Sequence, residues 1–116
     1  MSVVRDLCCS PVLAGQLPVR DALELASALK VLADPVRLRL LGLIRSAPGG
    51  RALTRDLVAS LEVSQPTVSH HLGAMFDAGF VDREHQGRET WYSIEPDTFA
   101  TLRQLLDPNP ARAVGR

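Results

Sequence analysis

The sequence predicts a mainly α-helical fold with one small β-hairpin, and three observations support this. Two short segments, residues 54–61 and 64–79, repeat apolar side chains at three- and four-residue steps, which is the spacing of amphipathic helices. Only two residues separate these segments, so the turn between the helices is tight. Two β-prone runs, 80–85 and 88–94, follow directly. This order is typical of a winged helix-turn-helix, with the elements ααααββα along the whole chain.

Length and charge limit the functions that the chain can have. With 116 residues it forms one domain with a single modest core. Its 13 Lys and Arg residues balance its 13 Asp and Glu residues, so any attraction to nucleic acid must come from local clustering. Between residues 35 and 55 no acidic residue occurs, and the chain carries Arg37, Arg39, Arg45, Arg51 and Arg55. The alternative interpretation of this cluster is an ordinary solvated basic face.

We divide the chain into an arm, a domain and a tail. Residues 1–20 contain Pro11 and Pro18 and no sustained periodicity, which predicts a flexible N-terminal arm. Residues 21–106 are the predicted winged helix-turn-helix domain, and residues 107–116 are a predicted disordered tail. No apolar run approaches the roughly 20 residues of a membrane span, and the N-terminus lacks a signal-peptide core. We therefore expect a cytoplasmic protein.

The arm holds both cysteines, Cys8 and Cys9, next to each other. Consecutive Cα atoms lie about 3.8 Å apart, less than the roughly 4.4 to 6.8 Å of an unstrained disulfide, so we expect none between them. Two adjacent thiolates in a reducing compartment can instead bind a soft, thiophilic ion, because its longer bonds to sulfur close the ring with less strain. The alternative is a pair of incidental, half-exposed cysteines.

The first predicted helix covers residues 21–33 and is apolar on more than one side, which indicates two packing partners. The second begins at Asp34, a good N-cap, with Pro35 at its first position. Its run 38–44 is apolar nearly all round, so we expect it to be the central core helix. A third helix over 54–61 would use Thr54 as its cap.

The segment 64–79 is interpreted as a recognition helix. Ser64 is a good N-cap, and Pro66 fits early in a helix, where a missing N–H costs little. Its apolar face consists of Val68, Leu72, Met75, Phe76 and Gly79. In the predicted DNA interface, bases face Gln65, Ser69 and His70, and phosphates face Ser64, Thr67, Arg37 and Arg88. The alternative is a helical hairpin in a small all-α core.

The remaining residues complete this interpretation. His71, at the edge of the apolar stripe, is assigned to packing or capping. The hairpin turns at Gln86 and Gly87, and its acidic residues outnumber its arginines, so we expect few phosphate contacts from it. The last helix, from about Pro96 to Leu106, carries an apolar face formed by Phe99, Leu102, Leu105 and Leu106.

Three stretches resemble the ArsR/SmtB family of winged-helix transcriptional repressors that respond to metals and metalloids. They are residues 29–44 (LKVLADPVRLRLLGLI), 64–81 (SQPTVSHHLGAMFDAGFV) and 87–94 (GRETWYSI), in the order and spacing of the family. The resemblance implies a homodimer formed by the first and last helices. Such a dimer matches palindromic operator DNA whose half-sites lie about one helical turn apart.

The resemblance also implies the effector. A branch of the family binds trivalent arsenic or antimony through a Cys-Cys pair in the arm and a third cysteine, and Cys8 and Cys9 match the pair. No third cysteine exists, so an exogenous thiol, a hydroxide or a second protomer would complete the coordination. The family's thiolate motif at the third helix is replaced by residues 53–57, and Asp97 in the last helix has no His or Cys partner for a zinc-type site.

The resemblance thus implies a repressor that leaves its operator when arsenite or antimonite binds, with no catalytic cofactor. One alternative keeps the DNA-binding dimer but makes the cysteines a thiol-redox switch or a sensor of another ligand. A more distant alternative is a thiol enzyme such as an arsenate reductase. That enzyme would need a Cys-x-x-Cys pair or an arginine six residues after a cysteine, where Ala14 and Gly15 stand. We therefore expect no enzyme.

Overall fold

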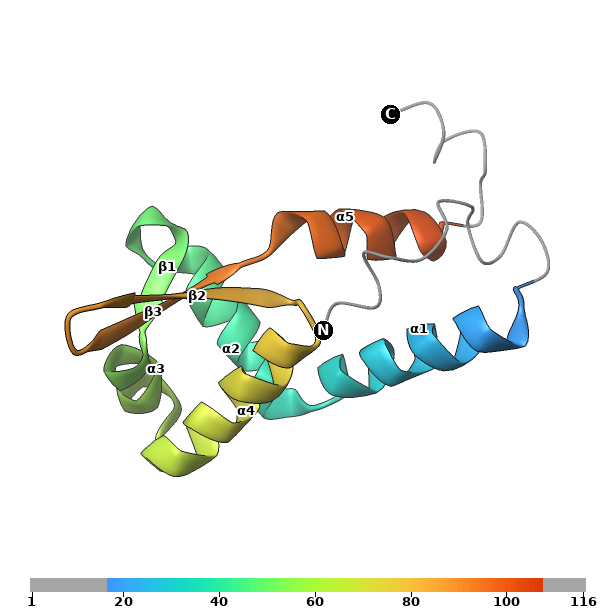
Figure 1. The fold of residues 1–116 in the computed structure, drawn as a ribbon. Helices are drawn as coiled ribbons and strands as arrows, with labels where there is room; N and C mark the ends of the chain where they lie inside the picture. The colour runs from blue at the N-terminus through green and yellow to red at the C-terminus, as the bar shows by residue number, and fades with distance from the viewer. Residues whose placement is uncertain (1–16, 108–116) are drawn as a thin grey trace.

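The structure is a computed structural model that describes residues 17–107, so the predicted site at Cys8 and Cys9 lies outside the described residues. Within this range the structure contains five α-helices and a three-stranded antiparallel sheet (Figure 1). In chain order the elements are α1 (Val19–Leu32), α2 (Pro35–Ser46), β1 (Arg51–Leu53), α3 (Thr54–Leu61), α4 (Gln65–Asp77), β2 (Val81–Gln86), β3 (Glu89–Ile94) and α5 (Pro96–Leu105). The predicted mainly helical, winged helix-turn-helix architecture is confirmed.

The sheet differs from the prediction by one strand. The strand order is β1-β3-β2, so β3 lies in the centre and pairs on one side with β2, as predicted for the hairpin. On its other side β3 pairs with β1, with Ala52 opposite Tyr92. Three residues are too few to show an alternating pattern, so β1 has no periodic signal in the sequence. The hairpin of β2 and β3, residues 81–94, is the wing of the fold, and the pairing of β1 with β3 holds the start of α3 against its base.

Helix α2 contributes to the core as predicted, but it is not buried all round, because Leu38 in its apolar run is 54% exposed. Leu40 and Ile44 of α2 are fully buried, and the buried side of α4 packs into the same core. Phe80 follows α4 and is also fully buried. Thr98 of α5 is buried too, and its hydroxyl donates a 2.6 Å hydrogen bond to the carbonyl of Gly79. This bond fixes the start of α5 to the turn between α4 and the wing.

The predicted caps of α2 and α4 are seen, whereas the predicted starts of α3 and α1 are wrong. The Asp34 carboxylate accepts hydrogen bonds from the amides of Val36 and Arg37 at 2.8 and 3.2 Å, which caps α2. At α3, however, Thr54 is the first helical residue and the N-cap is Leu53, with no side-chain cap. The reason is that β1 runs directly into α3, so the capping position belongs to a buried strand residue. The first helix begins at Val19, two residues before the predicted start.

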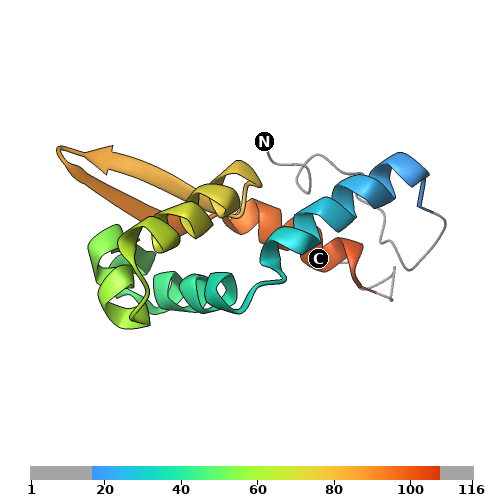
Figure 2. The ribbon, with the colours of Figure 1, turned by 90° about the horizontal axis from the view of Figure 1, so that it is seen from below.

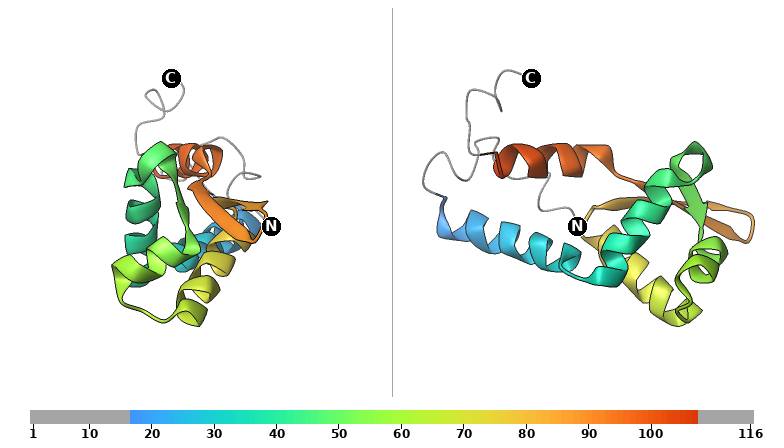
Figure 3. Two further views of the ribbon diagram at one scale, coloured as in Figure 1. Left: turned by 90° about the vertical axis from the view of Figure 1, so that its left-hand side faces the viewer. Right: turned by 180° about the vertical axis from the view of Figure 1, so that it is seen from behind.

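The hairpin and the helices α1 and α5 lie toward opposite ends of the molecule. The hairpin of β2 and β3 projects at one end, whereas α1 and the last turns of α5 extend at the other (Figures 1 and 3). Between them α4 runs beside α2, and it is fully visible from below (Figure 2). No helix in residues 17–107 is long and apolar enough to cross a membrane.

Candidate nucleic-acid interface

The recognition helix α4 has a buried back and an exposed front. Val68, Leu72 and Met75 show no exposed surface and pack into the core. At its start the Ser64 hydroxyl accepts a 3.4 Å hydrogen bond from the Thr67 amide and donates to the Thr67 hydroxyl at 2.9 Å. The cap thus fixes the end of the helix that a major groove would receive.

Five of the seven predicted DNA contacts are exposed on or just before this helix. They are Ser64, Gln65, Thr67, Ser69 and His70. All five carry short or planar hydrogen-bonding groups, and none is an acid. A front of this kind can bind base edges or phosphate oxygens without repelling DNA.

Arg37 lies away from this front and joins three helices. Its Nε donates to Nδ1 of His71 in α4 at 2.9 Å, and its Nη1 donates to the carbonyl of Val31 in α1 at 3.1 Å. His71, which we assigned to packing or capping, is therefore the acceptor of an inter-helix hydrogen bond, and its Nδ1 must be unprotonated to accept. The predicted phosphate contact of Arg37 would have to use the N–H groups of Nη1 and Nη2 that these two bonds leave over.

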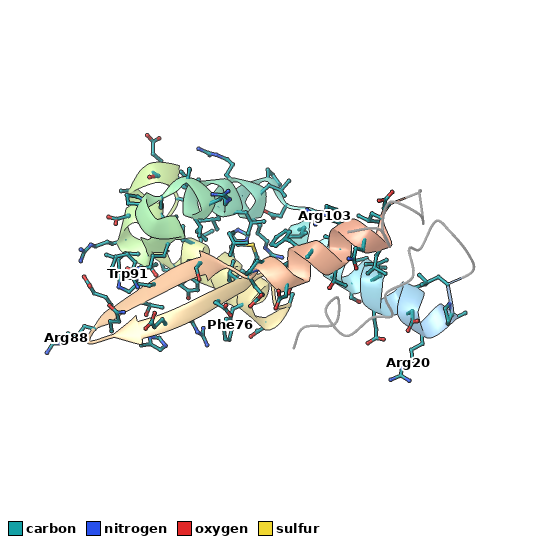
Figure 4. All side chains as sticks on the ribbon, turned by 90° about the horizontal axis from the view of Figure 1, so that it is seen from above. Arg20, Phe76, Arg88, Trp91 and Arg103 are labelled. Atoms are coloured by element: carbon teal, nitrogen blue, oxygen red, sulfur yellow. The ribbon has the colours of Figure 1, made fainter. Side chains whose placement is uncertain are left out.

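Arg88 lies at the tip of the wing. The turn between β2 and β3 consists of Gly87 and Arg88, because Gln86 pairs with Glu89. Gly87 has a φ of 63°, the left-handed conformation that a glycine adopts without strain. The exposed Arg88 side chain points away from the end of the hairpin (Figure 4). The tip can therefore place one positive charge beyond the rest of the protein.

Two acids of the wing, Glu84 and Glu89, are paired with arginines that come from outside the hairpin. Glu84 lies 3.7 Å from Arg51 of β1, and Glu89 lies 2.9 Å from Arg55 of α3. Because these arginines neutralise two of the hairpin's acids, the acidic excess seen in the hairpin sequence overstates the negative charge of the wing. The basic cluster over residues 35–55 is the sequence signal for these ion pairs. The sequence could not show which acids the arginines meet, because that depends on strand β1, which has no signal of its own.

Two arginines also stack on aromatic rings around the wing. The Arg51 guanidinium lies 4.1 Å from the ring centroid of Trp91, and that of Arg83 lies 3.9 Å from the ring centroid of Phe76 in α4. Figure 4 shows Trp91 and Phe76 on opposite sides of the hairpin. The wing is thus held to β1 on one side and to the recognition helix on the other.

A cleft of about 220 Å³ lies between the wing and the starts of α3 and α4. It is lined by Leu53, Thr54, Arg55, Gln65, Arg88, Glu89 and Thr90. The cleft brings together a predicted base contact, Gln65, and a predicted phosphate contact, Arg88. Among residues 17–107, no three His, Cys, Asp or Glu side chains gather in a group that could hold a metal ion.

The family and two curated relatives match this architecture. The sequence model of the family described as "Bacterial regulatory protein, arsR family" matches residues 34–83, from the cap of α2 into β2. The arsenical resistance operon repressor of Staphylococcus xylosus is 34% identical over 72% of this chain and 78% of its own length. The probable mercury resistance operon repressor of Streptomyces lividans is 35% identical over 83% of this chain and 78% of its own length.

Solved structures give the same result for the fold. The crystal structure of a possible transcriptional regulator for arsenical resistance has a TM-score of 0.62 and 34% identity, over 69% of this chain and 80% of that one. A homodimeric winged helix-turn-helix domain from Mycobacterium bovis, a possible ArsR-family regulator, has a TM-score of 0.60 and 24% identity, over 78% of this chain and 84% of that one.

These relatives are DNA-binding regulators and not enzymes, which excludes the thiol enzyme considered above. Three of them exceed 30% identity over more than two thirds of the chain. Their names include both arsenicals and mercury, so they do not single out one effector. The chain belongs to the ArsR family of winged helix-turn-helix transcriptional repressors.

Proposed function

We propose that this protein is a homodimeric repressor that binds operator DNA through the exposed front of α4 and leaves it when a thiophilic metalloid binds. The observation that carries the DNA-binding part is the division of α4 into a fully buried back and a front of hydrogen-bonding side chains. A helix of this kind can enter the major groove with its N-terminal residues against the bases. The operator lies in the cytoplasm, where we place the protein.

The roles follow from side-chain chemistry. The amide of Gln65, the hydroxyl of Ser69 and the imidazole of His70 would read base edges, because each can donate and accept hydrogen bonds. The phosphate contacts would come from Ser64, Thr67, Arg37 and Arg88. These contacts orient the protein on the duplex without reading its sequence.

Exposed apolar side chains support a dimer formed by α1 and α5. Val19 and Leu23 of α1 are 76% and 65% exposed, and Leu106, which follows α5, is 42% exposed. All three lie at the end of the molecule opposite the wing. A two-fold dimer would bury such side chains and would carry two recognition helices, one for each half of a palindromic operator.

The proposed effector is arsenite or antimonite held by Cys8 and Cys9, with a third ligand from a small thiol, a hydroxide or the second protomer. Its support is the chemistry of two adjacent thiolates together with relatives named for arsenical and mercury resistance. Coupling of about 1 to 3 kcal/mol between metalloid and DNA would lower the DNA affinity by about 5- to 150-fold.

The experiment is release of bound DNA titrated with arsenite, antimonite, cadmium and zinc under reducing conditions. It compares the native chain with the double variant Cys8→Ser, Cys9→Ser, on a duplex that the native chain binds. The double variant should bind the duplex as the native chain does and should no longer respond to arsenite or antimonite. An unchanged response would show that the sensor site is elsewhere, while leaving DNA binding intact.

A further inference from the structure

The cleft between α3, α4 and the wing contains an ion pair that bears on DNA binding. We propose that Arg55 is a DNA-phosphate contact and that Glu89 is its internal competitor. The Glu89 carboxylate occupies, in the free protein, the position that a backbone phosphate oxygen takes in the complex. This inference deepens the proposed DNA-binding function and rests on it.

The pair is open to exchange. Arg55 Nη1 lies 2.9 Å from Glu89 Oε2, and the two side chains are 72% and 42% exposed. An exposed ion pair contributes little to stability, so replacing one anion by another costs little. A guanidinium donates to phosphate oxygens as it does to carboxylate oxygens, so the Arg55 Nη1 that now contacts Glu89 can donate to a phosphate instead.

The cleft lies where a duplex must pass. Gln65, at the start of α4, lines one side, and Arg88, at the wing tip, lines another. DNA that meets both the recognition helix and the wing therefore lies over Arg55. With Arg55 and Arg88 as cations and Glu89 as the only acid among the lining residues, the cleft carries a net charge of about +1. The hydroxyl of Thr54 is a further donor for a phosphate, whereas that of Thr90 is hydrogen-bonded to Nδ1 of His85 at 3.0 Å.

Glu89 then has a definite effect on affinity. It holds Arg55 in place before DNA arrives, but its charge repels any phosphate that enters the cleft. Phosphates are the same in every sequence, so this repulsion weakens binding to all duplexes alike. Neutralising Glu89 should therefore strengthen binding even to DNA that contains no operator.

The test measures binding of a short, mixed-sequence duplex by fluorescence anisotropy at several KCl concentrations. Glu89→Gln is compared with Glu84→Gln, which removes the same charge from the same hairpin. Glu84 pairs with Arg51 at 3.7 Å and does not line the cleft, so it is a matched control. We expect Glu89→Gln to bind roughly 3- to 10-fold more tightly, the effect of relieving one like-charge contact near a solvated surface, and Glu84→Gln to change affinity less than about twofold.

The second half of the test replaces the cation. Arg55→Gln should bind more weakly, and its plot of log affinity against log salt should be shallower by about 1, the loss of one phosphate contact. The gain from Glu89→Gln should shrink when Arg55 is already replaced. Equal gains from Glu89→Gln and Glu84→Gln, or an unchanged salt slope for Arg55→Gln, would overturn the inference. A native chain that binds no duplex at low salt would instead overturn the proposed function itself.

Discussion

At the scale of single residues, helix caps decide where the DNA-facing helix begins. The Ser64 hydroxyl accepts the Thr67 amide at 3.4 Å, which is long for a hydrogen bond, so its contribution should lie in the lower part of the usual range. We expect Ser64→Ala to lower the free energy of unfolding by about 0.5 to 1 kcal/mol. Urea unfolding measures this, and Ser69→Ala, at an exposed site inside the same helix, is the control. Equal losses for both variants would contradict the capping role.

The Asp34 cap of α2 makes the free energy of unfolding depend on pH. The amide hydrogen bond from Arg37 holds the pKa of Asp34 below its ordinary value of 3.8. A carboxylate whose pKa is lowered by folding adds stability above its unfolded pKa, and this is lost as the pH falls through the folded pKa. Asp34→Asn can still accept the amides but cannot titrate. The stability advantage of the native chain over this variant should therefore shrink below pH 3.8.

The measurement is the urea midpoint of the native chain and of Asp34→Asn. It is taken near neutral pH and again well below the ordinary pKa of Asp34. If both proteins lose stability in parallel as the pH falls, the Asp34 cap does not contribute to the acid sensitivity. Such a result would assign that sensitivity to other carboxylates.

At the scale of elements, Arg37 connects the recognition helix to α1 through α2. His71→Ala removes the acceptor of the 2.9 Å bond from Arg37 Nε, a half-buried bond that involves a charged donor. We expect a loss of about 1 kcal/mol in the free energy of unfolding, because water can partly replace the imidazole. His70→Ala is the neighbouring control and should change stability by less than about 0.5 kcal/mol.

The two histidine variants should separate stability from DNA binding. His70 is exposed on the front of α4, so His70→Ala should weaken DNA binding at nearly native stability. Urea unfolding and a duplex titration on both variants provide the comparison. A His70 variant that loses as much stability as the His71 variant would contradict the division of roles between the adjacent imidazoles.

Much of the element order could be predicted from the sequence, and the failures have physical causes. Residues with a strong local signal, such as Asp34 before Pro35 and Ser64 before Pro66, begin helices as predicted. Strand β1 could not be predicted, because it exists only through its pairing with β3. The mistaken cap at Thr54 has the same origin.

The candidate site shows the same limit. The exposure of Gln65, Ser69 and His70 follows from helical periodicity, so the front of α4 could be read from the chain. The sequence could not predict the hydrogen bonds that Arg37 donates to His71 and Val31. Nor could it predict the ion pairs of Arg51 and Arg55. These join residues far apart in sequence, and only the packing of the helices and the sheet brings them together.

At the scale of the whole molecule, the exposed apolar surface of α1 predicts a dimer that an acidic side chain should disrupt. Leu23 is 65% exposed, so Leu23→Glu costs the free protomer little but places a charge in the proposed interface. Leu38→Glu is the control, since Leu38 is 54% exposed on α2, outside the α1 and α5 surface. Analytical ultracentrifugation should find dimers for the native chain and Leu38→Glu and monomers for Leu23→Glu. A dimeric Leu23→Glu protein would place the interface elsewhere.

The most direct test of the central claim, that α4 reads DNA, is a selection of tightly bound duplexes from a random-sequence library. The native chain should enrich an inverted repeat with half-sites about one helical turn apart. Gln65→Ala should relax the preference at one position in each half-site, with a loss of about 1 to 3 kcal/mol in discrimination there. The claim that α4 reads DNA would be contradicted if the native chain enriched no sequence. It would also be contradicted if variants at Gln65, Ser69 and His70 enriched the same sequence as the native chain.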